Sequence, residues 1–246
     1  MSLNPLAPVT DHQAMLNRIA WFTTASALGA VWILRLSIRD LDRLLSEIDY
    51  TVAFGDNRVL PMPGGFLIPA LAVGMLTRIF RAHARISDWL GIRECFDVDI
   101  IISELAAQSA VDLAPLTDEE LVAHRHSIMR RAFYAYVSGA RPQIDPQLIS
   151  QALDAWSWFW IGIEATFVFV LTGMGLLAGG VYSLGIQTLV GVLGLAAIGL
   201  PAMHRQCRRY AVAQVRAIVA DPIRAAEVQR IFAELADYPV ANRHAA

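Results

Sequence analysis

Long uncharged apolar stretches occupy the C-terminal half of the chain. The longest extends from Ala165 to Met203, which is enough for two membrane-spanning helices of about 20 residues each. Gly179 and Gly180 interrupt it near its centre, as expected where an apolar helix ends in a glycine C-cap. The pattern therefore predicts a transmembrane helical hairpin over residues 156–203, with a short uncharged turn.

The first helix of this hairpin should begin before the apolar stretch. Asp145 and Pro146 supply an N-cap residue and a proline at the first helical position. Trp156, Trp158 and Trp160 follow, and aromatic residues gathered at one end of an apolar run mark the headgroup level of a membrane. We expect this helix to start outside the bilayer and to enter it at the tryptophans.

The second helix of the hairpin is expected to start near Ile186 and to continue to about Ala220. Asp221 and Pro222 then repeat the pair of an N-cap residue and a proline, which predicts a further amphipathic helix. Residues 204–246 are therefore expected to form a basic juxtamembrane segment and a C-terminal cytoplasmic helix.

Two shorter apolar runs lie within residues 1–80, which we interpret as an N-terminal membrane region. Residues 19–34 carry no charge, which is short for a span but sufficient with tilt or snorkelling arginines. The second apolar segment covers about residues 59–78, and prolines and glycines crowd its first half. It either spans the membrane or is re-entrant.

A heptad pattern predicts one long helix over about residues 11–48. Apolar residues leave the first apolar run at alternating steps of four and three, as in a coiled-coil seam. These residues are Ala27, Val31, Leu34, Ile38, Leu41, Leu45 and Ile48. The seam needs a partner helix beyond the bilayer, either from the protein's own body or from a second subunit.

Residues 81–155 are predicted to form a helical cytoplasmic segment. Thr117 and Glu120 have the spacing of a capping box at the start of a helix. The run from Asp99 to Ser103 suits a helix or a strand. The fold class expected is therefore all-α: a polytopic membrane protein with about four membrane helices, this central segment and the C-terminal helix.

Composition supports a membrane protein. Apolar residues make up 56% of the chain and charged residues 17%, against about 25% charged in soluble domains. Two cysteines and a net charge of −2 argue against a disulfide-stapled module and a basic nucleic-acid-binding domain. All 20 basic residues are arginine, which suggests a bacterial gene of high GC content. The partners expected are the lipid bilayer and other membrane subunits or further copies, with no nucleic acid.

Arginines on both sides of the hairpin predict its orientation. Arg130, Arg131 and Arg141 precede it, and Arg205, Arg208 and Arg209 follow it. The positive-inside rule therefore places both ends of the hairpin, and with four spans both termini, in the cytoplasm of a bacterial inner membrane. The segment between the first two apolar runs also carries arginines, which the rule disfavours outside. The alternative keeps that segment inside and the second run re-entrant.

Glu164 is the one acidic residue of the predicted hairpin. Ionisable residues inside a membrane suggest a transport pathway or a proton relay. Glu164 also lies one turn after Trp160, so it could instead sit at the interface and pair with an arginine. Both interpretations stay open at this point.

Other polar and small residues suggest binding or packing roles. Arg205, Arg208 and Arg209 lie directly after the last predicted span, and we expect them to contact anionic lipid headgroups. Small residues let membrane helices approach closely, and the hairpin has two pairs of them. These are Gly175 with Gly179, and Gly191 with Gly194.

Metal and catalytic motifs are weak in this chain. Glu120 and His124 share a helix face, as do His204 and Cys207, but zinc needs about four such ligands. The sequence has no P-loop, dinucleotide fingerprint or nucleophile elbow. We therefore expect no catalytic residue, metal or cofactor.

Three functions are compatible with this pattern. The first is a non-enzymatic inner-membrane subunit or scaffold of a larger assembly of the secretion or conjugation type. The alternative is a homo-oligomeric pore or channel gated from the cytoplasmic side, which Glu164 and the glycines of the hairpin favour. A membrane-embedded enzyme is the third.

Overall fold

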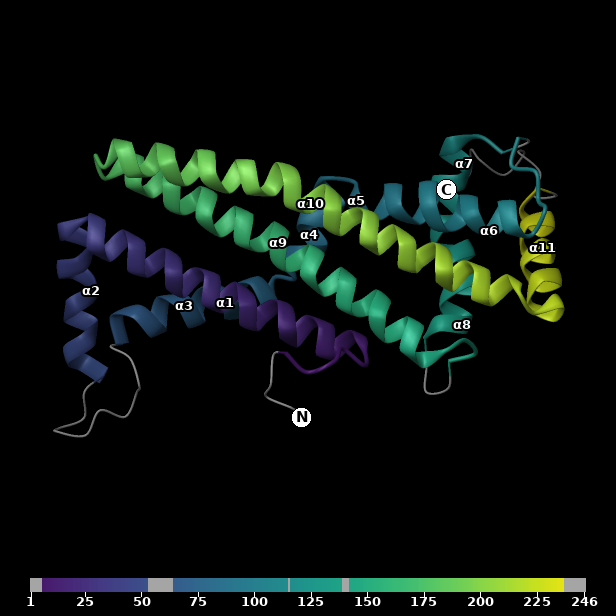
Figure 1. Cartoon of the computed structure of the whole chain (residues 1–246), viewed down its shortest axis with the longest axis horizontal. Coiled ribbons are helices and arrows are strands. Elements are labelled where there is room, and N and C mark those ends of the chain that lie inside the picture. Colours follow the sequence, from purple (N-terminus) through teal and green to yellow (C-terminus); the bar gives the residue numbers. More distant parts are fainter. Residues whose placement is uncertain (1–5, 53–63, 115, 139–141, 237–246) are drawn as a thin grey trace, which may run out of the picture. The chain divides into compact units, whose positions relative to one another are not determined.

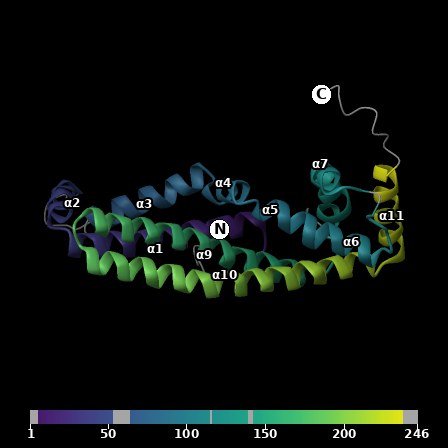
Figure 2. The ribbon, with the colours of Figure 1, turned by 90° about the horizontal axis from the view of Figure 1, so that it is seen from above.

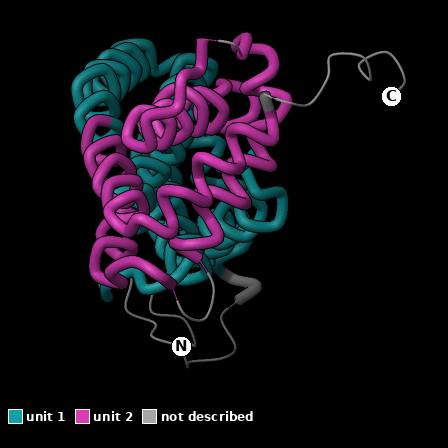
Figure 3. Tube along the Cα trace, turned by 90° about the vertical axis from the view of Figure 1, so that its right-hand side faces the viewer, with its two compact units in different colours: residues 1–84, 153–204 teal, residues 85–152, 205–246 magenta. Residues whose placement is uncertain are grey.

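The computed structural model describes residues 6–52, 64–114, 116–138 and 142–236, and within these ranges it contains helices and no strand. The predicted all-α class is therefore confirmed for the described chain. Two compact units can be distinguished (Figure 3). Unit 1 comprises residues 1–84 and 153–204, and unit 2 comprises residues 85–152 and 205–246.

In the described part of the chain, three helices are long and apolar enough to cross a membrane. They are α1 (His12–Ser37), α9 (Pro146–Ala178) and α10 (Tyr182–Val219). Two shorter helices, α3 (Gly64–Ile79) and α4 (Ala82–Trp89), pass the same test together but are bent by 59° at the break between them. The count of three, or up to four, is consistent with the expected number of apolar spans.

Local capping signals place several helix ends as the sequence predicts. Asp11 caps α1, and its carboxylate accepts a hydrogen bond from the Ala14 backbone N–H at 2.8 Å. Helix α9 begins at Pro146, directly after Asp145. The turn between α9 and α10 contains Gly180 with φ +78°, a left-handed conformation that favours glycine.

Contacts between helices fix the direction of each helix in unit 1. Helices α1 and α9 run parallel, since Arg18 pairs with Asp154 near their starts and Ile38 packs on Gly179 near their ends. Helix α3 is antiparallel to α1, because Arg78 at the end of α3 donates to Asn17 near the start of α1 at 2.6 Å. Their courses can be followed in Figure 1 and Figure 2.

Helix α10 packs antiparallel to α9. A Cβ on Gly173 of α9 would meet the Leu189 side chain of α10, and one on Gly162 would meet Leu200. Unit 1 therefore has two ends. The first, called the Arg18 end, contains the start of α1, the end of α3 and His204. The second, called the elbow end, contains the end of α1 and the turn at Gly179.

The prediction of one continuous helix over about residues 11–48 is wrong. Helix α1 ends at Ser37, and α2 (Arg39–Val52) follows after Ile38, whose φ of −120° and ψ of 102° are extended. The break turns the chain so that α2 packs against both α1 and α3. The heptad pattern continues through Ile38, but the contacts of Arg35, three residues earlier, determine the direction that α2 takes.

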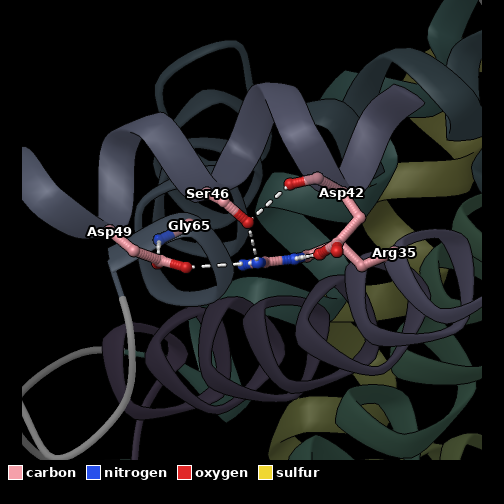
Figure 4. Close-up of polar contacts among 5 residues, drawn as sticks. All are labelled: Arg35, Asp42, Ser46, Asp49 and Gly65. Atoms are coloured by element: carbon pink, nitrogen blue, oxygen red, sulfur yellow. Dashed lines mark hydrogen bonds and ion pairs between the residues drawn. The ribbon is translucent and has the colours of Figure 1, made fainter. Parts of the chain in front are cut away.

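Arg35 holds this elbow together (Figure 4). Its Nε donates to Asp42 at 2.8 Å, and its Nη2 donates to Ser46 and to Asp49 at 3.1 Å each. A straight helix would carry these α2 side chains away from the Arg35 guanidinium. Asp49 in turn accepts from the backbone N–H of Gly65, which joins α2 to the start of α3.

Residues of the heptad pattern contact helices of the same chain. Leu34 and Ile38 lie beside Gly175 and Gly179 of α9. Leu45 is buried on α2. Leu41 and Ile48, also on α2, are half-buried. The first part of the predicted apolar segment 59–78 lies outside the described residues, and its remainder forms α3.

Unit 2 packs short helices around its own core. They are α5 (Ile92–Cys95), η1 (Phe96–Ile102), α6 (Ser103–Gln108), α7 (Asp118–Ile128), η2 (Met129–Tyr134), α8 (Ala135–Val137) and α11 (Pro222–Ala236). Helix α11 packs against α6, α7 and η2, and the largest fully buried side chains include Phe96, Ile128 and Phe232. Both hydrogen bonds of the Thr117 capping box are present. The ambiguous run 99–103 is helical, and most of it belongs to the π-helix η1.

Replacing Arg35 should destabilise unit 1. The substitution Arg35→Gln removes the charge-assisted hydrogen bonds to Asp42 and Asp49, and a hydrogen bond to a charged group contributes about 1.5–3 kcal/mol. The free energy of unfolding, followed by tryptophan fluorescence in detergent, measures the loss. Arg43→Gln is the matched control, because Arg43 is 82% exposed and lies 3.9 Å from Asp40. Equal losses in the two variants would contradict the role of Arg35.

Candidate functional site

Buried polar side chains connect α1 to α9 at the Arg18 end. Arg18 is 4% exposed and forms an ion pair with Asp154. Its guanidinium also donates to the hydroxyl of Ser157 at 3.1 Å and to the backbone carbonyl of Ala7 at 2.6 Å. The ring of Trp158 lies 5.6 Å from the Arg18 guanidinium carbon, a distance typical of a cation–π contact. The buried positive charge is thus neutralised by a carboxylate that is itself 42% exposed.

Glu164 joins three helices of unit 1. It is 4% exposed and accepts a hydrogen bond from the Thr23 hydroxyl of α1. The backbone N–H of His83, in the first turn of α4, also donates to its carboxylate. The residue before α4, Arg81, has φ 48°, so the chain turns sharply at this point. A carboxylate at a helix N-terminus satisfies backbone N–H groups that have no partner within the helix.

Aromatic contacts place Glu164 near the Arg18 end of unit 1. The ring of Trp160, one turn earlier on α9, lies 6.2 Å from the ring of His83. The neighbouring Phe159 ring lies 5.8 Å from His204 on α10. Glu164 therefore lies close to the tryptophans that the sequence assigns to the headgroup level, and its partners are a hydroxyl and a backbone N–H in place of the arginine considered from the sequence.

The glycines of the hairpin divide into two groups. A Cβ on Gly175 or Gly179 would contact Leu34 or Ile38 of α1, so both positions allow close helix packing. No heavy atom lies within 4 Å of a Cβ placed on Gly191 or Gly194 of α10. These two glycines face away from the described residues of the chain.

The basic residues after the hairpin are exposed on α10. Arg205, Arg208 and Arg209 continue the helix without a break. No carboxylate among the described residues lies within ion-pair distance of any of the three.

The metal candidates are not assembled into a site. Within the described ranges, no group of three or more histidine, cysteine or acidic side chains is close enough to hold an ion. Cys207 is buried, and His204 packs against Phe159.

A buried ionic cluster in unit 2 was missed by the sequence analysis. Asp97, on the π-helix η1, is 4% exposed, and its Oδ2 lies 3.9 Å from the Nε atoms of Arg93 and Arg125. Arg93 also donates to the hydroxyl of Tyr134 on the second π-helix, η2. Arg125 lies 3.4 Å from Glu94. Asp97 stands in an apolar stretch of sequence, which is the one local signal that could have indicated it.

Burial governs the electrostatics of this cluster. It raises the pKa of the Asp97 carboxyl to about 6, although Arg93 and Arg125 act in the opposite direction. Burial and the Asp97 charge also raise the pKa of the Tyr134 hydroxyl. Because the pKa of Asp97 is about 6, the cluster can change its charge near neutral pH. The cluster also lies on π-helical turns, which are rare in proteins as a whole but often occur at functional sites.

Fold and polar contacts together define the class of protein: over its described residues, the chain is all-helical and has three helices, or up to four, that are long and apolar enough to cross a membrane. Residues 11–229 match the YmfE protein family, and the chain belongs to this family. No curated protein and no solved structure matches the chain.

Thr23 and Glu164 should be energetically coupled. In a double-mutant cycle with Thr23→Val and Glu164→Met, we expect a coupling free energy of about 1 kcal/mol, as for hydrogen bonds between membrane helices. Unfolding in detergent, followed by tryptophan fluorescence, measures each corner of the cycle.

Thr172 provides the control for this cycle. It is 2% exposed like Thr23, but its hydroxyl donates to the Val168 carbonyl of its own helix. Thr172→Val should therefore show no coupling to Glu164→Met. Additive effects for the Thr23 pair, within about 0.3 kcal/mol, would show that the hydrogen bond does not hold α1 to α9.

Ionisation of Asp97 should destabilise unit 2. Its pKa is 3.8 when unperturbed and about 6 in the fold, so the folded protein binds the proton more tightly. The stabilisation that protonated Asp97 gives to the fold is therefore fully present below pH 4, and it is lost as the pH rises from 4 to 6. The difference between the two pKa values corresponds to about 3 kcal/mol in the free energy of unfolding.

Thermal unfolding between pH 4 and pH 7.5 measures this effect. The stability difference between Asp97→Asn and the unmodified protein should change across the window, because the asparagine stays neutral. Asp99→Asn is the matched control, since Asp99 lies two residues away and is exposed. A pH profile for Asp97→Asn that parallels that of the unmodified protein would refute the assignment.

Proposed function

We propose that the chain is an integral protein of a bacterial inner membrane, with unit 1 in the bilayer and unit 2 in the cytoplasm. We further propose that it acts as a non-enzymatic subunit or scaffold of a larger membrane-protein assembly. The observation that carries this proposal is the inside-out polarity of unit 1, which buries Arg18, Arg35 and Glu164 against polar partners and exposes its large apolar side chains.

The exposed surface of unit 1 is suited to lipid. Soluble proteins rarely expose large continuous apolar patches. The large hydrophobic side chains exposed on α1, α3, α9 and α10 include Trp21, Trp32, Leu71, Met75, Leu171, Met174, Ile186, Val190, Leu193, Leu195 and Ile198. Hydrocarbon chains are the medium in which such a surface is stable.

The buried charges are placed to suit a bilayer. Arg18 and Arg35 lie roughly 25 Å apart along α1, at 1.5 Å per residue. That distance is close to the hydrocarbon thickness of about 30 Å. Both guanidinium groups have carboxylate partners within unit 1. An unpaired arginine at this depth would be costly, so the pairing supports embedding.

The helix directions support four crossings with the Arg18 end in the cytoplasm. Helices α1 and α9 leave this end, and α3 and α10 return to it. Arg205, Arg208 and Arg209 come directly after His204 in α10, at the end of the helix that leaves unit 1, which agrees with the positive-inside rule. Arg35 does not count as a free charge on the opposite side, because it is buried in the elbow.

Structural use of the polar groups supports a subunit role. Arg18, Arg35 and Glu164, the charged side chains buried in the described part of unit 1, connect helices to one another. Unit 2 has its own core of buried apolar side chains. A homo-oligomeric pore is the alternative, and the open positions at Gly191 and Gly194 favour self-association through α10.

Cysteine labelling tests the topology. In a Cys95→Ser background, which keeps only the buried Cys207, cysteines introduced one at a time at Leu44, Tyr182 and Ile223 probe α2, the hairpin turn and α11, where these side chains are 61%, 66% and 81% exposed. A membrane-impermeant maleimide added to intact cells should label positions 44 and 182. It should label position 223 only after lysis. Labelling of position 223 in intact cells would contradict the orientation.

Purification from native membranes tests the subunit role. Under gentle detergent extraction, the tagged chain should co-purify with a defined set of other membrane proteins in fixed ratio. A homogeneous homo-oligomer that conducts ions in planar bilayers would overturn the scaffold and support the pore. Recovery of the chain in the soluble fraction would overturn membrane embedding itself.

A further inference from the structure

One face of α10 changes from apolar to basic along its length. Leu195 and Ile198 are 74% and 78% exposed, and Arg205 and Arg209 continue the same face at helical steps of three, four and seven residues. Ala202, between them, is exposed as well. Pro201 lies in α10 between the apolar and the basic residues, but the helix is continuous from Tyr182 to Val219, so these side chains form a single stripe on its surface.

The apolar part of this stripe is unusually open. Only 6% of the apolar window of α10 is buried, compared with 28% for α1 and 33% for α9. A Cβ on Gly191 or Gly194 would meet no heavy atom within 4 Å, and both positions continue the stripe away from the arginines. The surface therefore has room for an extended hydrocarbon chain.

The basic part of the stripe has no internal counter-charge. No carboxylate among the described residues lies within ion-pair distance of Arg205, Arg208 or Arg209. By contrast, the neighbouring arginine on the same helix, Arg216, lies 3.8 Å from Glu104. Exposed guanidinium groups match the geometry of phosphate oxygens.

We propose that this face of α10 binds an anionic phospholipid, whose phosphate contacts Arg205, Arg208 and Arg209 and whose acyl chain lies along Ile198, Leu195 and Gly191. An acidic protein segment would satisfy the arginines but not the apolar stripe that leads directly into them. One molecule that is anionic at one end and apolar along its length satisfies both. The proposal rests on the embedding of unit 1 in a membrane, and it adds a specific lipid class and site.

Lipid retention in vesicles tests the site. The full chain is reconstituted in vesicles of equal amounts of phosphatidylglycerol and phosphatidylcholine, extracted in mild detergent and analysed by native mass spectrometry. The unmodified protein should retain more phosphatidylglycerol than phosphatidylcholine. In the double variant Arg205→Gln/Arg209→Gln, the ratio of the two retained lipids should fall by about 30-fold, the effect expected of two arginines near an anionic surface.

Arg39→Gln/Arg43→Gln is the matched control, because it removes two exposed arginines at the opposite end of unit 1. It should leave the preference unchanged. Equal preference in all three proteins would overturn the site. So would displacement of the lipid by millimolar inorganic phosphate, because the ligand would then be a free anion.

A carbonate wash separates this proposal from membrane embedding. A chain that stays in the vesicles after the wash but retains both lipids equally refutes the lipid site alone. A chain that the wash removes refutes embedding, and with it the site.

Discussion

Two buried arginines on α1 constrain the rest of unit 1. A guanidinium group stays charged at any physiological pH, so it must find a carboxylate wherever water is excluded. Arg18 finds Asp154 on α9, and Arg35 finds Asp42 and Asp49 on α2. The first pair sets the register between α1 and α9. The second pair turns the chain at Ile38 and brings α2 against α3.

Further polar contacts follow from this arrangement. With α1 and α9 parallel, the Thr23 hydroxyl faces Glu164, and the remaining capacity of the carboxylate is used at the start of α4. The same carboxylate thus supports the bend between α3 and α4, where the chain changes direction by 59°. Beyond Asp154 the acidic residue of α9, Glu164, is buried, so the outer surface of this part of the helix is left to uncharged side chains.

Local signals in the sequence were sufficient for many helix ends. Asp145 with Pro146, Gly179 with Gly180 and the Thr117 box act through neighbouring backbone groups, so their effects can be predicted without the fold. The break at Ile38 could not, because it depends on Arg35 meeting Asp49. The Asp97 cluster depends on Arg125, which is distant in sequence, and π-helical turns have no comparable local signal.

Spin-label accessibility tests the central claim that unit 1 places paired charges inside and apolar side chains in lipid. Nitroxides are attached at Leu195→Cys on α10 and at Ile223→Cys in unit 2, two strongly exposed positions. In vesicles, the label at position 195 should collide readily with oxygen and rarely with a water-soluble nickel chelate, and the label at position 223 should behave in the opposite way. Ready access of the nickel chelate to both labels would contradict the account.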